Sequence, residues 1–270
     1  MRVSEGTATK GAVDWILTVN GWAIYLFLYV PILIVMLFSF SDNPNVGIWG
    51  GFTLDWYDRM LGNDQLMRAL RNSVIVAIVS TVISTILGTA AALALERYRR
   101  WLGKRPFDAL LYLPVIIPDV TMAVMLLIWF AQLEFRLGLT TILLSHIAFN
   151  ISFVAIVVRA RLANMDDALE EAAADLYASR WQAFRRVTLP LIWPGVIGGG
   201  LLALTLSLDD VVVTSFVQGP GATTLPVYVF GLIRRTVTPE INAVSTVMLV
   251  ASMVLVFISL VFQRRSDNPS

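Results

Sequence analysis

Several residue types are scarce in this chain, and each shortage excludes a class of function. The 270 residues include no cysteine and a single histidine. Disulfides, cysteine nucleophiles and histidine metal clusters are therefore excluded, and no metal site is expected. Charged residues make up only 14% of the chain, whereas a soluble domain has about 25%. The net charge of +1, with no cluster of basic and aromatic residues, gives no indication of nucleic-acid binding.

Motifs for nucleotide binding and catalysis are also missing. Gly103-Lys104 looks like the end of a phosphate-binding loop, but Arg105 stands where serine or threonine belongs. Tyr98 stands where the first glycine of that loop belongs. The sequence shows no Ser/His/Asp, Cys/His or metal-ligand arrangement. We therefore expect no catalytic site, no cofactor and no ATPase site, so that any chemistry has to be supplied by another chain.

Hydrophobic residues, by contrast, make up 57% of the chain, which predicts an all-α membrane protein. A helix needs about 20 apolar residues to cross a bilayer. We expect residues 1–270 to form one transmembrane domain, with the first apolar segment kept as a span rather than removed as a signal peptide. Six segments are long enough, near residues 18–40, 72–95, 107–132, 138–160, 191–217 and 241–263.

The basic residues are distributed unevenly between the two sides of these spans. One side holds 14 of them: Arg2, Lys10, Arg97, Arg99, Arg100, Lys104, Arg105, Arg159, Arg161, Arg180, Arg185, Arg186, Arg264 and Arg265. The other side holds six: Arg59, Arg68, Arg71, Arg136, Arg234 and Arg235. Because basic loops remain on the inner side, both termini are predicted to be cytoplasmic.

Three acidic residues lie away from the ends of the expected spans, where a charge costs about 3 kcal/mol on insertion scales. Asp119 follows Pro114 and Pro118, which are expected to break the third span. Asp209 and Asp210 are adjacent in the fifth span, and neighbours on a helix point about 100° apart, so one of them suffices to face a pathway. Unpaired carboxylates predict a route for a cation. The alternative is that each is protonated or hydrogen-bonded within the protein.

Two segments on the expected outer side contain patterns that a simple connecting loop does not need. Residues 42–71 contain aromatic residues natural at a membrane interface, among them Trp56. Residues 218–240 contain a Gly-Pro-Gly turn and an amphipathic run from Leu225 to Ile233. Pro239-Glu240 then suits the first turn of the sixth span. Both segments are candidates either to face an extracytoplasmic partner or to anchor at the interface.

Other polar and small residues in the spans are interpreted as packing features. His146 and Asn150 are four residues apart and share one face of the fourth span, which predicts hydrogen bonds to a neighbouring helix. Small residues allow helices to approach closely, and the fifth span begins with such a group: Gly195, Gly198, Gly199 and Gly200.

Residues 164–190 form the longest polar break between two apolar segments. Asp166 or Asp167 is placed to cap a first short helix, whose apolar residues recur at helical spacing. Ser179 followed by Gln182 is a capping-box pattern and predicts a second helix. A helical hairpin between two spans, with small alanines on one face, is expected to dock against another protein.

The hairpin resembles the EAA loop of ABC importer permeases: EAA, three residues, Gly, nine residues, Ile, any residue, Leu-Pro. Tyr177 stands where glycine is usual and Val187 replaces isoleucine; glycine enters a left-handed turn more readily than tyrosine. The resemblance implies that the hairpin couples an ATPase to transport. The residues assigned to this role are Glu171, Ala172, Ala173, Asp175, Tyr177, Leu189 and Pro190.

Further segments extend the resemblance over nearly the whole chain. Residues 207–210 (SLDD), 216–226 and 239–243 are similar to those of polyamine importer permeases, most of all the second permease subunit of the putrescine system. The resemblance implies a type I permease in the bacterial inner membrane. Its implied partners are a second permease, two copies of a cytoplasmic ATPase subunit and a periplasmic polyamine-binding protein. Putrescine is the expected substrate, and spermidine or another small solute is the alternative.

A polyamine carries at least two positive charges near neutral pH, so carboxylates and aromatic faces suit its path. The expected path leads past Trp56 to Asp209 or Asp210, and then past Asp119. A secondary transporter is the less favoured reading, because such folds usually repeat a broken helix and only one span here has the proline break. A membrane scaffold without transport conflicts with the three intramembrane acids.

Overall fold

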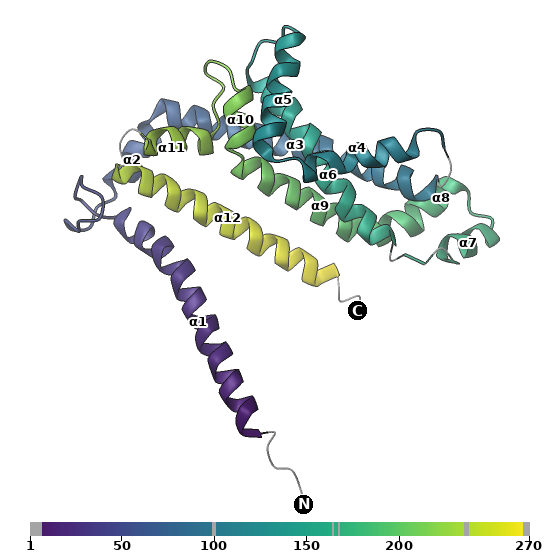
Figure 1. The fold of residues 1–270 in the computed structure, drawn as a ribbon, viewed down its shortest axis with the longest axis horizontal. Helices are drawn as coiled ribbons and strands as arrows, with labels where there is room; N and C mark the ends of the chain where they lie inside the picture. Colours follow the sequence, from purple (N-terminus) through teal and green to yellow (C-terminus); the bar gives the residue numbers. More distant parts are fainter. Residues whose placement is uncertain (1–6, 99–100, 164, 167, 235–237, 267–270) are drawn as a thin grey trace, which may run out of the picture. The chain divides into compact units, whose positions relative to one another are not determined.

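The computed structural model describes residues 7–98, 101–163, 165–166, 168–234 and 238–266, which are largely helical (Figure 1). Within these ranges the strand-like pairing is one isolated bridge between Ser41 and Phe52. The all-α class predicted from composition is thus confirmed. The chain divides into two compact units, Met1–Asn63 with Ile233–Leu255 and Asp64–Leu232 with Val256–Ser270, and each is described by itself.

Four stretches of helix are long and apolar enough to cross a membrane. They contain α1 (Thr7–Phe38), α3 (Asp64–Arg97), α6 (Leu139–Ala163) and α9 (Leu189–Asp209), and they match the first, second, fourth and fifth predicted spans. The third predicted span is a pair of helices, α4 (Lys104–Ile116) and α5 (Asp119–Gln132), bent by 116° at the break. The break at Pro118 was therefore predicted, but its sharp bend was not. The expectation that Pro114 also breaks the helix was wrong, because Pro114 lies inside α4.

The sixth predicted span lies in α12 (Pro239–Ser266), whose described apolar stretch, Pro239–Val254, is shorter than the others. By length and hydropathy, the described residues thus contain four spans, or five when the bent pair counts as one. Pro239 begins the helix and Glu240 lies in its first turn, as the sequence predicted.

The first unit contains α1, α2 (Asp55–Gly62) and the beginning of α12. Ser41 organises the loop after α1: its hydroxyl donates to Ile48 O at 2.8 Å and accepts from Gly50 N at 3.1 Å. After α2, Asn63 Nδ2 donates to Glu240 Oε1 at 3.0 Å, which joins this loop region to the start of α12. These polar contacts, together with the packing of the Phe40 ring against Phe52 and Tyr57, hold the loop region of this unit together.

The core of the second unit is built from α3, α6 and α9, which approach one another at glycines. A Cβ added to Gly88 of α3 would lie 2.8 Å from Val154 Cβ of α6, and one added to Gly199 of α9 would lie 3.2 Å from Val154 Cα. Gly200 lies against Thr85 of α3 in the same way. The expectation that these small residues serve packing is confirmed.

Two short helices complete the second unit. Next to α9 is α10 (Val212–Val217), and Thr141 of α6 donates from Oγ1 to Val217 O at 2.7 Å. The predicted amphipathic run is α11 (Leu225–Ile233). Its first amide donates to Ser73 Oγ of α3 at 2.7 Å, so the segment that follows α10 returns to α3.

The hairpin comprises α7 (Ala168–Asp175), α8 (Arg180–Ala183) and the π-helix η1 (Phe184–Thr188). Ala168 N donates to Asp166 Oδ1 at 3.0 Å, and the Ser179–Gln182 capping box is present, as predicted. The second arm runs into α9 without a break, and Pro190 lies in the first turn of α9. The reason is that proline is tolerated in the first turn of a helix and does not end the preceding turn. The expected residues Arg2, Arg99, Arg100, Asn164, Asp167 and Arg235 lie outside the described ranges.

Candidate substrate path and coupling hairpin

Asp119 is the first residue of α5, directly after the break. Its side chain is exposed, and no hydrogen bond or ion pair to it occurs within the described residues. A carboxylate in the first turn is favoured by the positive end of the helix dipole. The break thus presents one unpaired negative charge at a helix end.

The two adjacent acids after α9 have different environments. Asp209 ends α9, is exposed, and has no side-chain partner among the described residues. The backbone of Asp210 is extended, with φ −66° and ψ 123°, so the 100° separation expected for neighbours on one helix does not apply. The physical reason is that Asp210 caps α10, accepting from Val213 N at 3.1 Å and Thr214 N at 2.8 Å.

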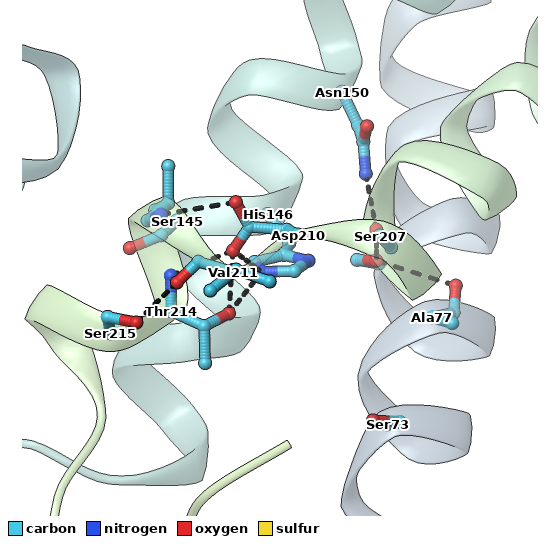
Figure 2. Close-up of polar contacts among 12 residues, drawn as sticks. Ser73, Ala77, Ser145, His146, Asn150, Ser207, Asp210, Val211, Thr214 and Ser215 are labelled. Carbon is cyan, nitrogen blue, oxygen red and sulfur yellow. Dashed lines mark hydrogen bonds and ion pairs between the residues drawn. The ribbon is translucent and has the colours of Figure 1, made fainter. Parts of the chain in front are cut away.

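Asp210 is further held by a buried polar cluster (Figure 2). The Thr214 hydroxyl donates to Asp210 Oδ2 at 2.7 Å, and His146 Nε2 lies 3.0 Å from that hydroxyl oxygen and 3.3 Å from Oδ2. Because the hydroxyl proton is already given to the carboxylate, Nε2 must be the donor toward both oxygens. His146 is fully buried, and its Nδ1 has no partner in the described structure.

The second member of the predicted polar pair also bonds across helices. Asn150 Nδ2 donates to Ser207 Oγ of α9 at 2.8 Å, and Ser207 Oγ lies 2.9 Å from Ser80 Oγ of α3. Figure 2 shows this contact beside the His146 cluster. The prediction that His146 and Asn150 make inter-helix hydrogen bonds is confirmed.

Trp56 belongs to the first unit and lies in α2. Its indole N–H donates to Ser41 O at 2.7 Å, which fixes the ring, and its side chain is half-buried. The guanidinium carbon of Arg59 lies 4.8 Å from the ring centroid. The ring face therefore already holds a cation, which is the contact that an ammonium group would make with it.

An apolar cavity of about 510 Å³ lies in the bend between α4 and α5, next to α6. Leu113, Met125, Trp129 and Phe149 line it, and Gln132 is a polar residue of its wall. None of the lining residues is charged. Since an unpaired ammonium group is costly to dehydrate, this cavity does not suit the charged ends of a polyamine. The described residues also contain no group of three or more His, Cys, Asp or Glu able to hold a metal ion.

The residues predicted to couple to an ATPase lie mainly on the surface of the hairpin. Ala173 and Leu189 are half-buried, whereas the exposed members are Glu171, Ala172, Asp175, Tyr177 and Pro190. Tyr177 is 98% exposed and has φ +60°, so it adopts the left-handed conformation for which the family pattern has glycine. The turn is a complete Schellman motif, with Ala178 N donating to Ala173 O at 3.0 Å and Tyr177 N to Ala174 O at 2.9 Å.

Two ion-pair groups near the hairpin were not predicted from the sequence. Arg97 pairs with Glu170, the residue before the EAA triplet. Arg159 pairs with Glu96 at 2.6 Å and with Asp108 at 2.5 Å. The sequence did indicate partners for Arg159, because an arginine within a predicted span needs them. Glu96 and Asp108 both lie at the ends of predicted spans on the same side as Arg159.

Comparison with known proteins identifies the family. Residues 84–268 match the family described as "Binding-protein-dependent transport system inner membrane component". The chain is 40% identical over 250 residues to "Putrescine transport system permease protein PotI" of Escherichia coli K12, covering 90% of this chain and 89% of the relative. It is 41% identical over 242 residues to "Spermidine/putrescine transport system permease protein PotC" of the same strain, covering 90% and 91%.

The fold is shared with a solved bacterial ABC transporter involved in import of the acidic polysaccharide alginate. The TM-score is 0.70 at 20% identity, covering 95% of this chain and 98% of that one. The architecture is that of type I ABC importer permeases, whose subunits lack an ATPase site and depend on a partner subunit for ATP hydrolysis. This chain therefore belongs to the family of binding-protein-dependent transport system inner membrane components.

Proposed function

We propose that this chain is a permease subunit of an ATP-driven importer that carries polyamines into the bacterial cell, with putrescine as its substrate. The observation that carries the proposal is the identity of about 40%, over nine-tenths of the chain, with permeases named for putrescine and for spermidine. Relatives of both kinds are equally similar to this chain. The choice of putrescine over spermidine therefore rests on the resemblance of the segments around Asp209 and Pro239. Spermidine is the alternative.

In this proposal the chain crosses the inner membrane six times with both termini in the cytoplasm. The bent pair α4–α5 is the third span and α12 is the sixth. The excess of basic residues on the hairpin side supports this orientation. The partners are a second permease subunit, two copies of a cytoplasmic ATPase subunit and a periplasmic polyamine-binding protein.

Asp119 and Asp209 of the second unit are the proposed substrate contacts, and Trp56 of the first unit is proposed as a further one. A diammonium substrate loses hydration when it enters the membrane, and an unpaired carboxylate offsets that cost. Asp119 and Asp209 are exposed and have no side-chain partner in the described chain, so both are available for this role. Asp210 contributes differently, because its carboxylate is already engaged by α10 and His146. It holds the end of α9 on which Asp209 lies.

The hairpin supplies the coupling. Glu171, Asp175 and Tyr177 are exposed on its surface and form the face that contacts an ATPase subunit. Because η1 continues directly into α9, a movement of the second arm is a movement of the membrane helix itself. ATP-driven closure of the ATPase dimer then switches the spans between inward-open and outward-open packings.

The test is reconstitution of the complete complex in proteoliposomes with the binding protein. We expect uptake of labelled putrescine only with ATP and an active ATPase, and weaker uptake of spermidine. Equal or greater spermidine uptake would assign the chain to the alternative substrate. Uptake driven by a proton or sodium gradient without ATP would show a secondary transporter and overturn the proposal.

A further inference from the structure

The last turn of α3 carries two adjacent residues of opposite charge, and each joins α3 to a different part of the chain. Glu96 and Arg97 are neighbours on a helix, so their side chains point about 100° apart. Arg97 contacts the hairpin, and Glu96 contacts α6. All of these residues belong to the second unit.

Arg97 joins both arms of the hairpin. Its Nη2 pairs with Glu170 of α7 and donates to Thr188 Oγ1 of η1 at 2.6 Å. Thr188 Oγ1 in turn donates to Glu170 Oε1 at 2.5 Å, and Thr188 is fully buried. The guanidinium carbon also lies 6.0 Å from the ring centroid of Phe184. One side chain from a membrane helix therefore fixes α7 and η1 against each other.

Arg159 of α6 is the partner of Glu96, and it joins α3 to α4 as well as to α6. Its Nε donates to Glu96 of α3 at 2.6 Å, and its Nη1 donates to Asp108 of α4 at 2.5 Å. Nη1 also lies 3.3 Å from the hydroxyl of Tyr112, one turn further along α4. The planar guanidinium group thereby sets the directions of three helices, α3, α4 and α6.

These contacts are better suited to setting geometry than to supplying stability. The paired side chains are 22–35% exposed, and ion pairs near water contribute little to stability. The three long helices are already packed through the buried cluster around Val154, Val158 and Ile192. Loss of one pair therefore leaves the fold intact but releases the angle between the elements it joins.

We propose that Glu96 and Arg97 are positioning residues that transmit movement of the hairpin to α6 and α4, through their partners Arg159 and Glu170. The inference rests on the proposed function, because it requires an ATPase docked on the hairpin. α4 is the first half of the bent pair, and α5 begins at Asp119. A movement delivered to α4 thus reaches the break beside a proposed substrate contact.

The first test uses the complete complex in proteoliposomes and measures substrate taken up per ATP hydrolysed. Arg97→Glu and Glu170→Arg are each expected to lower this ratio at least fivefold with the complex still assembled. The exchange of both charges restores an ion pair at the same positions and is expected to return the ratio to within twofold of wild type. Arg105→Glu, in an exposed arginine of α4 with no ion pair among the described residues, is the matched control and is expected to be unchanged.

A second measurement does not depend on the substrate. Because the chain has no cysteine, Leu110→Cys on α4 and Ala168→Cys on α7 give a pair of exposed spin-label sites without background. In the assembled complex, we expect one narrow distance distribution with and without ATP and vanadate, since the two elements move together. Arg97→Glu is expected to broaden or split it, and the charge exchange to narrow it again.

The two measurements separate failure of the inference from failure of the proposed function. A wild-type complex that takes up neither putrescine nor spermidine contradicts the proposed function, while the label distances still decide the inference. The inference is overturned if the distance distribution stays narrow in Arg97→Glu. It is also overturned if the charge exchange gives no more substrate uptake per ATP hydrolysed than the single reversals.

Discussion

His146 Nε2 lies 3.3 Å from Asp210 Oδ2, and the histidine is fully buried between α6 and α10. The carboxylate therefore faces the protein interior, where it also caps α10, whereas its neighbour Asp209 is exposed. The two aspartates are adjacent in sequence, but α9 ends between them, so their side chains have different surroundings. Asp210 fixes the break between α9 and α10, and Asp209 has no side-chain partner among the described residues.

Substitutions at these two positions should consequently have different effects. Asp209→Asn should lower polyamine uptake at least fivefold with normal abundance, because the amide removes the charge that offsets ammonium dehydration. Asp210→Ala should instead destabilise the protein by about 1–3 kcal/mol, since it removes a cap and leaves buried donors unpaired. Asp210→Asn retains an acceptor for α10 and should restore part of the abundance. The measurements are uptake and a quantified blot of the assembled complex; wild-type uptake in Asp209→Asn would remove that residue from the path.

The sequence predicted most of the elements because the bilayer imposes a length and a hydropathy that can be read locally. Caps and breaks were equally local: Asp166, the Ser179–Gln182 box and the proline break at Pro118 all took the expected places. What escaped prediction depends on pairs distant in the chain. Arg97 and Glu170 are 73 residues apart, and no spacing pattern connects them.

The separate environments of the adjacent acids escaped prediction for a similar reason. The apolar run through Val211 reads as a continuous span, so Asp209 and Asp210 were expected on one helix. The extended backbone at Asp210 follows from a carboxylate that prefers the free amides of α10 to a helical position. Which carboxylate is satisfied by His146 depends on the packing of α6 against α10, which local sequence does not contain.

Glu171 provides a test of the hairpin as a docking surface. It is exposed and has no ion pair within the described residues, in contrast to its neighbour Glu170. Glu171→Lys should lower uptake severalfold and weaken retention of the ATPase, while abundance stays near normal because a surface charge contributes under about 1 kcal/mol. Glu134→Lys reverses an exposed acid outside the hairpin and serves as the control. Full uptake in Glu171→Lys, with the ATPase still bound, would exclude a coupling role.

Tyr177 gives a prediction about stability. Tyr177 is a non-glycine residue in the left-handed region, where the backbone strain costs about 1–2 kcal/mol. Glycine would remove this strain, but its greater freedom in the unfolded chain costs about 0.5–1 kcal/mol. Tyr177→Gly should therefore stabilise the Schellman turn by about 0.5–1 kcal/mol. Amide exchange over residues 173–178 should slow by about two- to fivefold. Ala174→Gly, inside α7, is the control and should speed exchange; equal or faster exchange in Tyr177→Gly would contradict the strain.

The glycine contacts between the long helices give the last prediction. A Cβ at Gly88 of α3 would lie 2.8 Å from both Ile151 O and Val154 Cβ of α6, so the helices have to move apart to accept it. At Gly198 of α9 the nearest atom, Val157 Cγ1, is 3.9 Å away, which is ordinary contact. Gly88→Ala should destabilise the purified protein by about 1–3 kcal/mol through overpacking. Gly198→Ala should be neutral or stabilise by up to about 1 kcal/mol, because alanine is the better helix former. The measurement is the midpoint temperature of thermal unfolding of both variants under the same conditions. Equal midpoint temperatures would mean that the packing of α3 against α6 does not depend on their close approach at Gly88.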